Sequence, residues 1–478
     1  MKIIERIKNF IRRVFVDYNK INRMIEDSTS RSNSYILESN SRQLSQLEQK
    51  AELKFNDITC QIDGCSQKLN KIEQEVKSNY IELSRSINHI KYCNTEIQGI
   101  INDKSKKNIL IVGFYGAPNL GDELMLETIL EYLKEVENKK ITIMLADNPN
   151  YNIDKYEDVS FIHYPVSLLD FNSLAEKFDC IIFGGGAIID DSNYEKALSY
   201  QYDLGTIFIK LAIRAIAFKK KVISIGLSSN KNLNNDEYVK KLEYVIKNSE
   251  FFSVRDEFSR EFLKSRIGCD IEKNINLVKD IVFANRKIKD NIICAEKKHG
   301  DRANVGIVYI ANDNNKEKLK LIIKSVESQY KNVNINLIPF YDYCNCDIEF
   351  YKSVINEIGN TNIKIIDYAN TMDEIIATYK ENDIIIGLRY HAILLAYILN
   401  IPCVSICYNI HEHYIYKINN LNQLFNKKSN LLYTTLGADG IKKVINGIVY
   451  EEQNDFELCN QIVDEAQEEF KKIIKQHI

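Results

Sequence analysis

This sequence has almost no net charge and no cysteine pattern that binds metal. Its 63 Lys and Arg residues face 66 Asp and Glu residues, a formal net charge of −3. No global positive field recruits nucleic acid, so we expect no nucleic-acid partner. The 11 cysteines include no CxxC pair and no four-ligand zinc spacing. We therefore expect a reduced, cytoplasmic chain with no tightly bound metal and no other cofactor.

A secretory signal and a membrane-spanning helix are also lacking. Lys and Arg residues between positions 2 and 13 interrupt the first apolar residues, and no small-residue cleavage site follows. The longest uncharged run, residues 392–410, approaches spanning length, but the segment 400–402 (Asn-Ile-Pro) divides it into two halves. This run predicts a helix, a turn and a buried strand.

Residues 1–27 predict a basic amphipathic helix. At about 100° per residue their apolar side chains fall on one arc, and Lys and Arg residues fill the other side. Such a helix lies either in an anionic bilayer interface, through residues 2–25, or on the protein's own surface. Amphipathicity alone does not distinguish the two, so peripheral contact with the inner face of the cytoplasmic membrane is one of two open interpretations.

Residues 42–104 predict a coiled coil. Apolar residues recur every seven positions in two series, which run from Phe55 to Ile97 and from Ala51 to Ile100. Polar residues in the second series either fix the register or mark where an intramolecular hairpin loosens. An apolar seam of this length needs a partner helix, so we expect a homo-oligomer formed through this segment.

From residue 108 onward, short β-branched runs alternate with helical segments. The runs predicted to be strands are 108–113, 141–145, 180–183, 222–226, 305–310, 363–366, 383–387 and 403–407. The alternation predicts parallel βαβ units with both faces of each sheet covered. A charged, irregular stretch at 285–303 predicts a linker between two Rossmann-like domains, 107–286 and 304–478.

A glycine-containing loop follows the first of these strands. The segment 113–123 (Gly-Phe-Tyr-Gly-Ala-Pro-Asn-Leu-Gly-Asp-Glu) leads into a helix, where backbone N–H groups and the helix dipole favour an anion. No Gly-Lys-Ser/Thr follows, so this is not a Walker loop. Asn119, Asp122 and Glu123 are polar groups at the carboxyl end of the first strand, the usual ligand position in an open α/β sheet. The structural alternative for Asp122 is a helix cap.

Three successive glycines follow the strand predicted at 180–183. With no side chains at Gly184, Gly185 and Gly186, a substrate can lie against the backbone, and donors can point at it. The structural alternative is a tight turn that needs positive φ. Because three glycines exceed what such a turn requires, the pattern favours substrate binding.

Basic residues follow two other predicted strands at their carboxyl ends. Arg255 follows a short strand, where its guanidinium can bind a carboxylate or a phosphate bidentately. The alternative is a surface ion pair with Asp256. Arg389 and His391 lie between a buried strand and a buried helix. That position is costly unless the two residues serve a ligand or a fixed ion pair.

Taken in order, these segments resemble the signatures of the polysaccharide pyruvyl transferases. The resemblance rests on 113–123, the glycine triplet, Ser253-Val-Arg-Asp256, Asp280 in Val-Lys-Asp-Ile-Val-Phe, and Gly387-Leu-Arg-Tyr-His391 followed by Asn-Ile-Pro, and it extends over 108–415. It implies two Rossmann-like domains in a GT-B-like arrangement. It also implies that phosphoenolpyruvate is the donor and that pyruvate is placed as a ketal on a sugar of a cell-surface polysaccharide or its lipid-linked precursor.

The resemblance further implies that Arg255, Arg389 and His391 contact the donor. We expect His391 to act as an acid or a phosphate contact, and Asp122 to orient or deprotonate the acceptor hydroxyl. Relatives carry Tyr-Asp-Pro-Lys after the strand at 403–407, where this chain has Tyr-Asn-Ile-His, so His411 is expected to bind substrate in place of a fixed cation. The other expected substrate-binding residues are Asn119, Glu123, Gly184, Gly185 and Gly186.

Two other functions stay open. A nucleotide-sugar glycosyltransferase has the same GT-B architecture, and fold does not settle function. The chain is alternatively a membrane-associated scaffold of a polysaccharide assembly complex, held by its helical arm.

Overall fold

The computed structural model describes Lys54 and most of residues 105–478. The gaps are 147–154, 166–167, 195–196, 199–200, 230–232, 295–301, 313–315, 331, 343–345, 360–361, 408–411, 428–430, 434–439, 442 and 445–454. The described residues from 105 onward belong to one compact unit. The helix predicted at 1–27 lies outside the described residues, as does the coiled coil predicted at 42–104 apart from Lys54. Oligomerisation and membrane contact through them stay predictions.

The first sheet has seven parallel strands in the order β3-β2-β1-β4-β7-β8-β9. Their bounds are β1 Lys107–Val112, β2 Lys139–Leu145, β3 Val159–His163, β4 Cys180–Gly184, β7 Lys221–Leu227, β8 Phe251–Val254 and β9 Asn276–Leu277. The strand order reverses between β1 and β4. In open α/β sheets ligands bind outside the carboxyl ends of the strands at this reversal, where the loops after β1 and β4 lie.

Helices cover both faces of this sheet. They are α3 Leu120–Leu133, α4 Leu168–Lys177, α5 Leu204–Ala217, α6 Asp236–Asn248 and α7 Glu257–Ile267; the short helices η1 Cys269–Asn274, η2 Ile281–Ala284 and α8 Arg286–Lys289 follow, and β5 Ala197–Leu198 pairs with β6 Gln201–Tyr202. Apolar side chains from α4, α5 and α6 form one core with the sheet, whereas α3 and η2 belong to a second core. The central strands β1, β4 and β7 are buried on both faces, which explains their almost continuous apolar sequences.

The second sheet has six parallel strands in the order β12-β11-β10-β13-β14-β15. Its elements are β10 Arg302–Val308, α9 Lys316–Gln329, β11 Asn332–Leu337, α10 Cys346–Ile358, β12 Ile363–Ile365, α11 Met372–Lys380, β13 Ile384–Gly387, α12 Tyr390–Ile398, β14 Cys403–Cys407, α13 Glu412–Leu424 and β15 Leu431–Tyr433. Here the order reverses between β10 and β13. The residues that follow β13 therefore lie at the second switch point.

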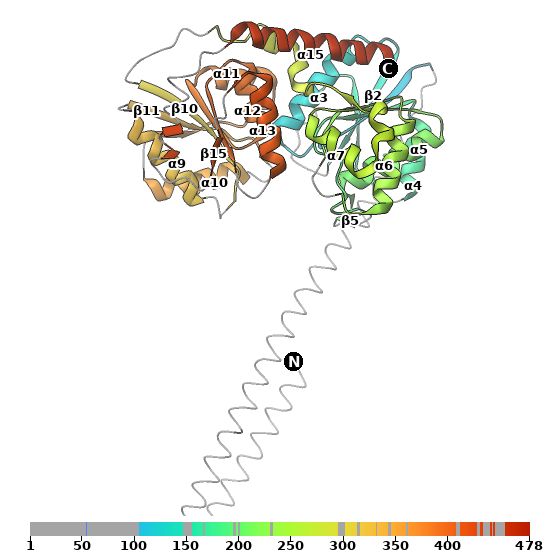
Figure 1. Ribbon diagram of the computed structural model, residues 1–478, viewed down its shortest axis with the longest axis horizontal. Helices are drawn as coiled ribbons and strands as arrows, with labels where there is room; N and C mark the ends of the chain where they lie inside the picture. The colour runs from blue at the N-terminus through green and yellow to red at the C-terminus, as the bar shows by residue number, and fades with distance from the viewer. Residues whose placement is uncertain are drawn as a thin grey trace, which may run out of the picture. The chain divides into compact units, whose positions relative to one another are not determined.

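The last helix, α15 (Phe456–His477), joins the two halves (Figure 1). It contacts α3, η2 and α8 from the first half and α12 from the second. Phe470 of α15 packs edge-to-face on Tyr132 of α3, with ring centroids 4.9 Å apart. One apolar core runs through both halves, from Leu120 to Phe340 and Ile474. The predicted fold class, two Rossmann-like domains in a GT-B-like arrangement, is confirmed.

The local predictions agree with the structure where sequences are continuously apolar. The run 392–410 contains helix α12, a turn with Asn400 at φ 63°, and strand β14, as predicted. Strand β11 was missed because it alternates Asn with apolar residues, and it is buried on one face only. The stretch 285–303 was wrongly predicted to be irregular throughout, since helix α8 folds within it and packs against α15. The domain boundaries themselves stay predictions.

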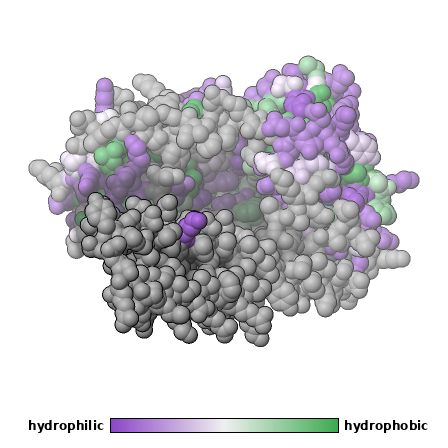
Figure 2. Space-filling view, turned by 90° about the horizontal axis from the view of Figure 1, so that it is seen from below, coloured by the Kyte–Doolittle hydropathy of each residue, from purple (hydrophilic) through white to green (hydrophobic). Residues whose placement is uncertain are grey.

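No helix in the described part of the chain is long and apolar enough to cross a bilayer. On the face seen in Figure 2, the visible described residues are mainly hydrophilic, with small hydrophobic areas between them.

Candidate active site

The loop after β1 places Asp122 in the first turn of α3. This helix begins at Leu120 after the N-cap residue Asn119, whose side chain makes no capping hydrogen bond. Instead, Asn119 Nδ2 donates a hydrogen bond to Asp122 Oδ2 over 2.6 Å. The helix-cap alternative for Asp122 is therefore wrong, and its carboxylate is held by a side chain of the loop.

The environment of Asp122 favours its protonated form. The residue is 8% exposed, and burial raises its pKa to about 7, with Arg255 opposing the shift and Glu123 and Asp280 adding to it. A carboxyl group with this pKa exists in both protonation states near neutral pH, as a general acid or base requires. Its Oδ1 faces Gly186, because a Cβ added at Gly186 would lie 3.1 Å from that oxygen.

Glu123 has a different environment although it is the next residue. Its Oε1 accepts a hydrogen bond from the backbone N–H of Gly116 over 3.1 Å. Its Oε2 accepts hydrogen bonds from Lys155 Nζ over 3.1 Å and Tyr156 Oη over 3.0 Å. Both oxygens therefore have partners that fix the loop, and direct contact of Glu123 with a substrate stays a prediction.

The turn after β4 by itself requires glycines. Gly185 has φ 75° and Gly186 has φ 82°, in the left-handed region that side chains disfavour. A Cβ added at Gly184 would lie 2.5 Å from Tyr115 Oη. Packing and backbone geometry thus account for the triplet without a ligand. Of the three, Gly186 lies against Asp122.

Arg255, at the carboxyl end of β8, forms the centre of an ionic cluster between the two halves. Its Nη1 donates a hydrogen bond to Asp280 Oδ2 over 2.7 Å and lies 3.4 Å from His391 Nε2. The same Asp280 oxygen is 3.5 Å from His391 Nε2. The side chains of Arg255 and Asp280 are 6% and 1% exposed. Arg255 Nε also lies 4.0 Å from Asp256 Oδ2, so the predicted pair with Asp256 is present but buried, and only its surface location is wrong.

The charges in this cluster hold one another ionised. Burial favours the neutral form of Asp280, but Arg255 and His391 outweigh it and hold the pKa of this carboxyl well below its usual range. Burial likewise disfavours the charge on Arg255, but Asp280, Tyr390 and Asp256 raise its pKa. The guanidinium carbon of Arg255 lies 4.5 Å from the centroid of the Tyr390 ring, a cation–π contact.

His391 packs directly on the first turn of α3. A Cβ added at Gly121 would lie 2.0 Å from His391 Nδ1. The imidazole is 13% exposed. A glycine at position 121 is therefore needed for a side chain of the second half to approach the helix of the first.

We expect Gly121→Ala to fold and to lose activity. Alanine stabilises a helix by about 1 kcal/mol relative to glycine, whereas its methyl group forces the His391 ring to move. We expect turnover to fall by about tenfold or more, since misplaced catalytic groups are costly. In a protein that already carries His391→Ala, the Gly121→Ala substitution should cause no further loss of turnover. Equal losses in the two backgrounds would show that Gly121 acts independently of His391.

Arg389 forms a second ionic pair, two residues before His391. Its Nη2 donates to both carboxylate oxygens of Asp347, over 3.0 and 3.2 Å. Asp347 is fully buried and also accepts hydrogen bonds from the backbone N–H groups of Phe340 and Tyr341. The Nε atoms of Arg389 and Arg255 are buried and have no hydrogen-bond partner among the residues that the structure describes. Each arginine therefore retains an unused donor.

Backbone pairing joins the loop after β1 to a loop of the second half. Leu120 donates its N–H to the carbonyl of Phe340 over 2.9 Å, and Asp342 donates to Pro118 over 2.9 Å. Between these bonds, Asn119 and Tyr341 form an antiparallel bridge. The loop after β1 and the loop after β11 are thus paired, so the site residues of both halves are already assembled in this state.

Several residues of the cluster were not predicted as site residues. Asp280 is one of the residues that carry the family resemblance, but no role was predicted for it. Tyr390, Asp347 and Lys417 were not predicted as site residues. Lys417 lies on α13 and is 6% exposed. One signal was present, because Lys417 is four residues before the buried Leu421 and therefore lies on the apolar side of its helix. His411 lies outside the described residues.

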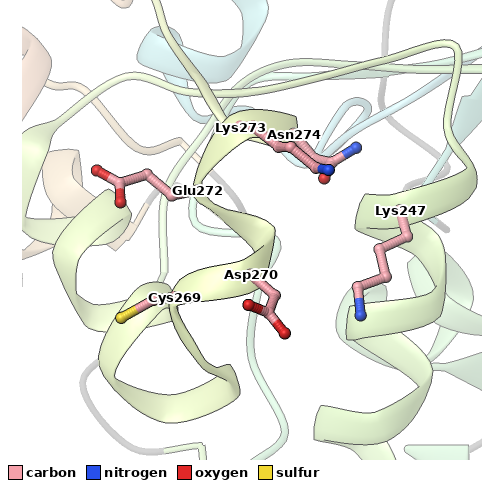
Figure 3. Close-up of a pocket in the computed structure, with 6 residues that line it drawn as sticks. All are labelled: Lys247, Cys269, Asp270, Glu272, Lys273 and Asn274. Atoms are coloured by element: carbon pink, nitrogen blue, oxygen red, sulfur yellow. The ribbon is translucent and has the colours of Figure 1, made fainter.

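A surface depression of about 810 Å³ lies apart from this cluster, between α6 and η1. Lys247 of α6 and Asp270 of η1 lie on opposite sides of it (Figure 3). Two charged residues that line it form ion pairs with neighbouring residues: Lys247 with Glu243, and Glu272 with Lys264. Within the described residues, no group of three or more His, Cys, Asp and Glu side chains is arranged to hold a metal ion.

Solved structures have a similar fold at low sequence identity. They include the UDP-GlcNAc 2-epimerase from Methanocaldococcus jannaschii, with 16% identity, a TM-score of 0.46, and coverage of 75% of this chain and 98% of that chain. The sucrose-phosphate synthase from Thermosynechococcus elongatus has 9% identity, a TM-score of 0.49, and coverage of 78% and 98%. Similarity at this level says nothing about the reaction of this chain.

Comparison with protein families gives a more specific result. No curated protein matches the chain. The family model described as polysaccharide pyruvyl transferase matches residues 119–409, which is more than half of the sequence and includes Asp122, Arg255, Arg389 and His391. The chain therefore belongs to the polysaccharide pyruvyl transferase family and is a transferase.

Proposed function

We propose that this protein transfers pyruvate from phosphoenolpyruvate, as a ketal, onto a sugar of a cell-surface polysaccharide or its lipid-linked precursor. The observation that carries the proposal is the convergence of Arg255 and Asp280 from the first half with His391 from the second, within 3.5 Å of one another. Family membership supports the same reaction class.

The donor has a carboxylate and a phosphate, so its site must supply N–H donors and positive charge. Arg255 and Arg389 are both ion-paired, and each has a buried Nε that makes no hydrogen bond in the described structure, although Arg255 Nε lies 4.0 Å from Asp256 Oδ2. Their carboxylate partners fix the guanidinium planes, and the unused N–H groups are the donors we assign to the ligand. Fixed donors of this kind cost little reorganisation when an anion binds.

The reaction begins with protonation of the donor's methylene carbon, which becomes a methyl group. One sugar hydroxyl attacks the resulting oxocarbenium-like carbon and releases its proton. Phosphate then leaves with its bridging oxygen as a second hydroxyl closes the ketal, and that hydroxyl's proton ends on phosphate or solvent. The products are a pyruvyl ketal and inorganic phosphate, so the reaction needs no redox partner.

His391 and Asp122 are the residues we assign to these proton transfers. His391 Nε2 has no contact shorter than 3.4 Å to a described polar atom, which leaves it able to protonate the donor or to bind its phosphate. Asp122, with a pKa of about 7, is suited to accept the proton of the acceptor hydroxyl. Asn119 holds the Asp122 carboxylate in position. We also assign His411 to substrate binding.

The proposal is tested by incubating the full chain with phosphoenolpyruvate and a panel of free and lipid-linked saccharides. We expect phosphate release that depends on the acceptor, and a product whose mass corresponds to addition of phosphoenolpyruvate and loss of phosphoric acid. Transfer from a nucleotide sugar, with no turnover of phosphoenolpyruvate under any condition, would instead establish glycosyl transfer.

A further inference from the structure

Lys417 is a buried cation that the mechanism above does not use. It lies on α13 of the second half, next to Ile418, which is fully buried. Helix α13 is held against α7 by stacking of Tyr416 on Phe258, with ring centroids 5.5 Å apart and planes at 21°. Lys417 is 6% exposed, and α7, on which its helix packs, begins two residues after Arg255.

The charged groups that act on Lys417 are Arg255 and Asp256. Burial and, to a smaller extent, Arg255 lower its pKa to about 8, and Asp256 opposes the shift. Asp256 is already engaged, because its carboxylate accepts hydrogen bonds from Ser259 N–H over 2.7 Å and Ser228 Oγ over 3.1 Å. Lys417 itself forms no hydrogen bond or salt bridge with any residue in the described part of the chain.

Lys417 differs in this respect from both arginines of the site. Arg255 is paired with Asp280, and Arg389 is paired with Asp347. Each of those pairs carries no net charge, so it offers directed donors but little uncompensated positive charge. Lys417 has only Asp256 as an opposing charge, and that carboxylate is shared with Arg255 and held by two serines. Burying an unpaired charge is costly, and an anionic ligand would remove that cost.

We propose that Lys417 is a further donor-binding residue and that its ammonium group binds the phosphate of phosphoenolpyruvate. The inference rests on the proposed function. A phosphate matches a lysine as a point charge, whereas a carboxylate matches the planar fork of an arginine. Phosphate is also the leaving group, so the cation beside it stabilises the charge that accumulates as the bond to carbon breaks.

The test compares Lys417→Met and Lys417→Arg with wild type, and uses Lys352→Met as a matched control. Methionine keeps the apolar stem, and Lys352 is a surface residue of α10 whose side chain is 55% exposed. In Lys417→Met we expect the KM for phosphoenolpyruvate to rise by about tenfold or more and the KM for the acceptor to stay unchanged. Inhibition by inorganic phosphate should weaken, and inhibition by pyruvate, which has only the carboxylate, should not. Lys417→Arg should recover part of the loss.

Thermal stability separates binding from a structural role. Replacing an unpaired buried cation by an apolar side chain of similar size should raise the Tm of the free protein, while phosphoenolpyruvate should stabilise the variant less than wild type. A lower Tm with unchanged donor KM would make Lys417 structural and overturn the inference. A raised KM for a phosphate-bearing acceptor alone would assign the ammonium to the acceptor and overturn it too.

Calorimetric titration with phosphoenolpyruvate distinguishes failure of this inference from failure of the proposed function. If wild type binds phosphoenolpyruvate and Lys417→Met binds it equally well, the assignment of Lys417 alone is wrong. If wild type does not bind phosphoenolpyruvate, the proposed function is wrong and the inference falls with it.

Discussion

Arg255→Met is expected to reduce kcat/KM for phosphoenolpyruvate by about a hundredfold or more and to destabilise the folded protein by about 3–5 kcal/mol. The activity falls because the donor loses a charged partner, and the stability falls because Asp280, 1% exposed on its side chain, keeps a buried charge without its guanidinium. Phosphate release and thermal denaturation measure the two effects.

The double variant Arg255→Met/Asp280→Asn separates these two causes. Removing both charges leaves no unpaired ion, so we expect the double variant to regain most of the lost stability while activity stays low. The amide oxygen of Asn still accepts the N–H of Val282 that caps η2. Recovery of activity together with stability would show that Arg255 acts only by supporting the fold.

Asp122→Asn is expected to abolish most turnover and to stabilise the protein at alkaline pH. Burial raises the pKa of Asp122 from 3.8 to about 7, which corresponds to on the order of 4 kcal/mol. The protonated form favours the folded state, so wild type has its full stability below the unfolded pKa near 4 and loses it as pH rises through about 7. Asparagine removes this dependence and keeps the oxygen that accepts from Asn119.

The measurement is the Tm of both proteins at pH 5 and pH 8, with kcat/KM recorded across the same range. The variant should gain Tm over wild type mainly at pH 8, whereas Glu237→Gln, an exposed carboxylate of α6, should show no such gain. Wild-type activity should rise with pH through about 7, because Asp122 acts as a base when ionised. A variant with normal turnover would remove Asp122 from the chemistry.

Local sequence was enough to predict where candidate site residues lie along the sheets. Arg255 and Arg389 each follow a short apolar run, and a run of that kind is a strand buried on both faces. Because parallel strands present their carboxyl ends at one edge, the residues after them gather there. Strand β11 was not predicted, since its Asn residues interrupt the apolar pattern.

Which candidates touch one another was not predictable from spacing. Arg255 and His391 are separated by 136 positions, yet they lie 3.4 Å apart. Their pairing depends on the backbone bonds between the loops at Leu120 and Phe340, and on the absence of a side chain at Gly121. The sequence suggested a free arginine or a surface pair with Asp256, whereas the fold buries Arg255 between Asp280 and Asp256.

The sequence by itself determined that the chain forms two Rossmann-like halves and which polar residues follow their strands. Both depend on short-range apolar periodicity. Tertiary structure decided which charges are compensated. It paired Arg255 with Asp280 and Arg389 with Asp347, and it buried Lys417 without a carboxylate partner in the described structure. Burial and the neighbouring charges set these states, and both depend on contacts between segments far apart in the chain.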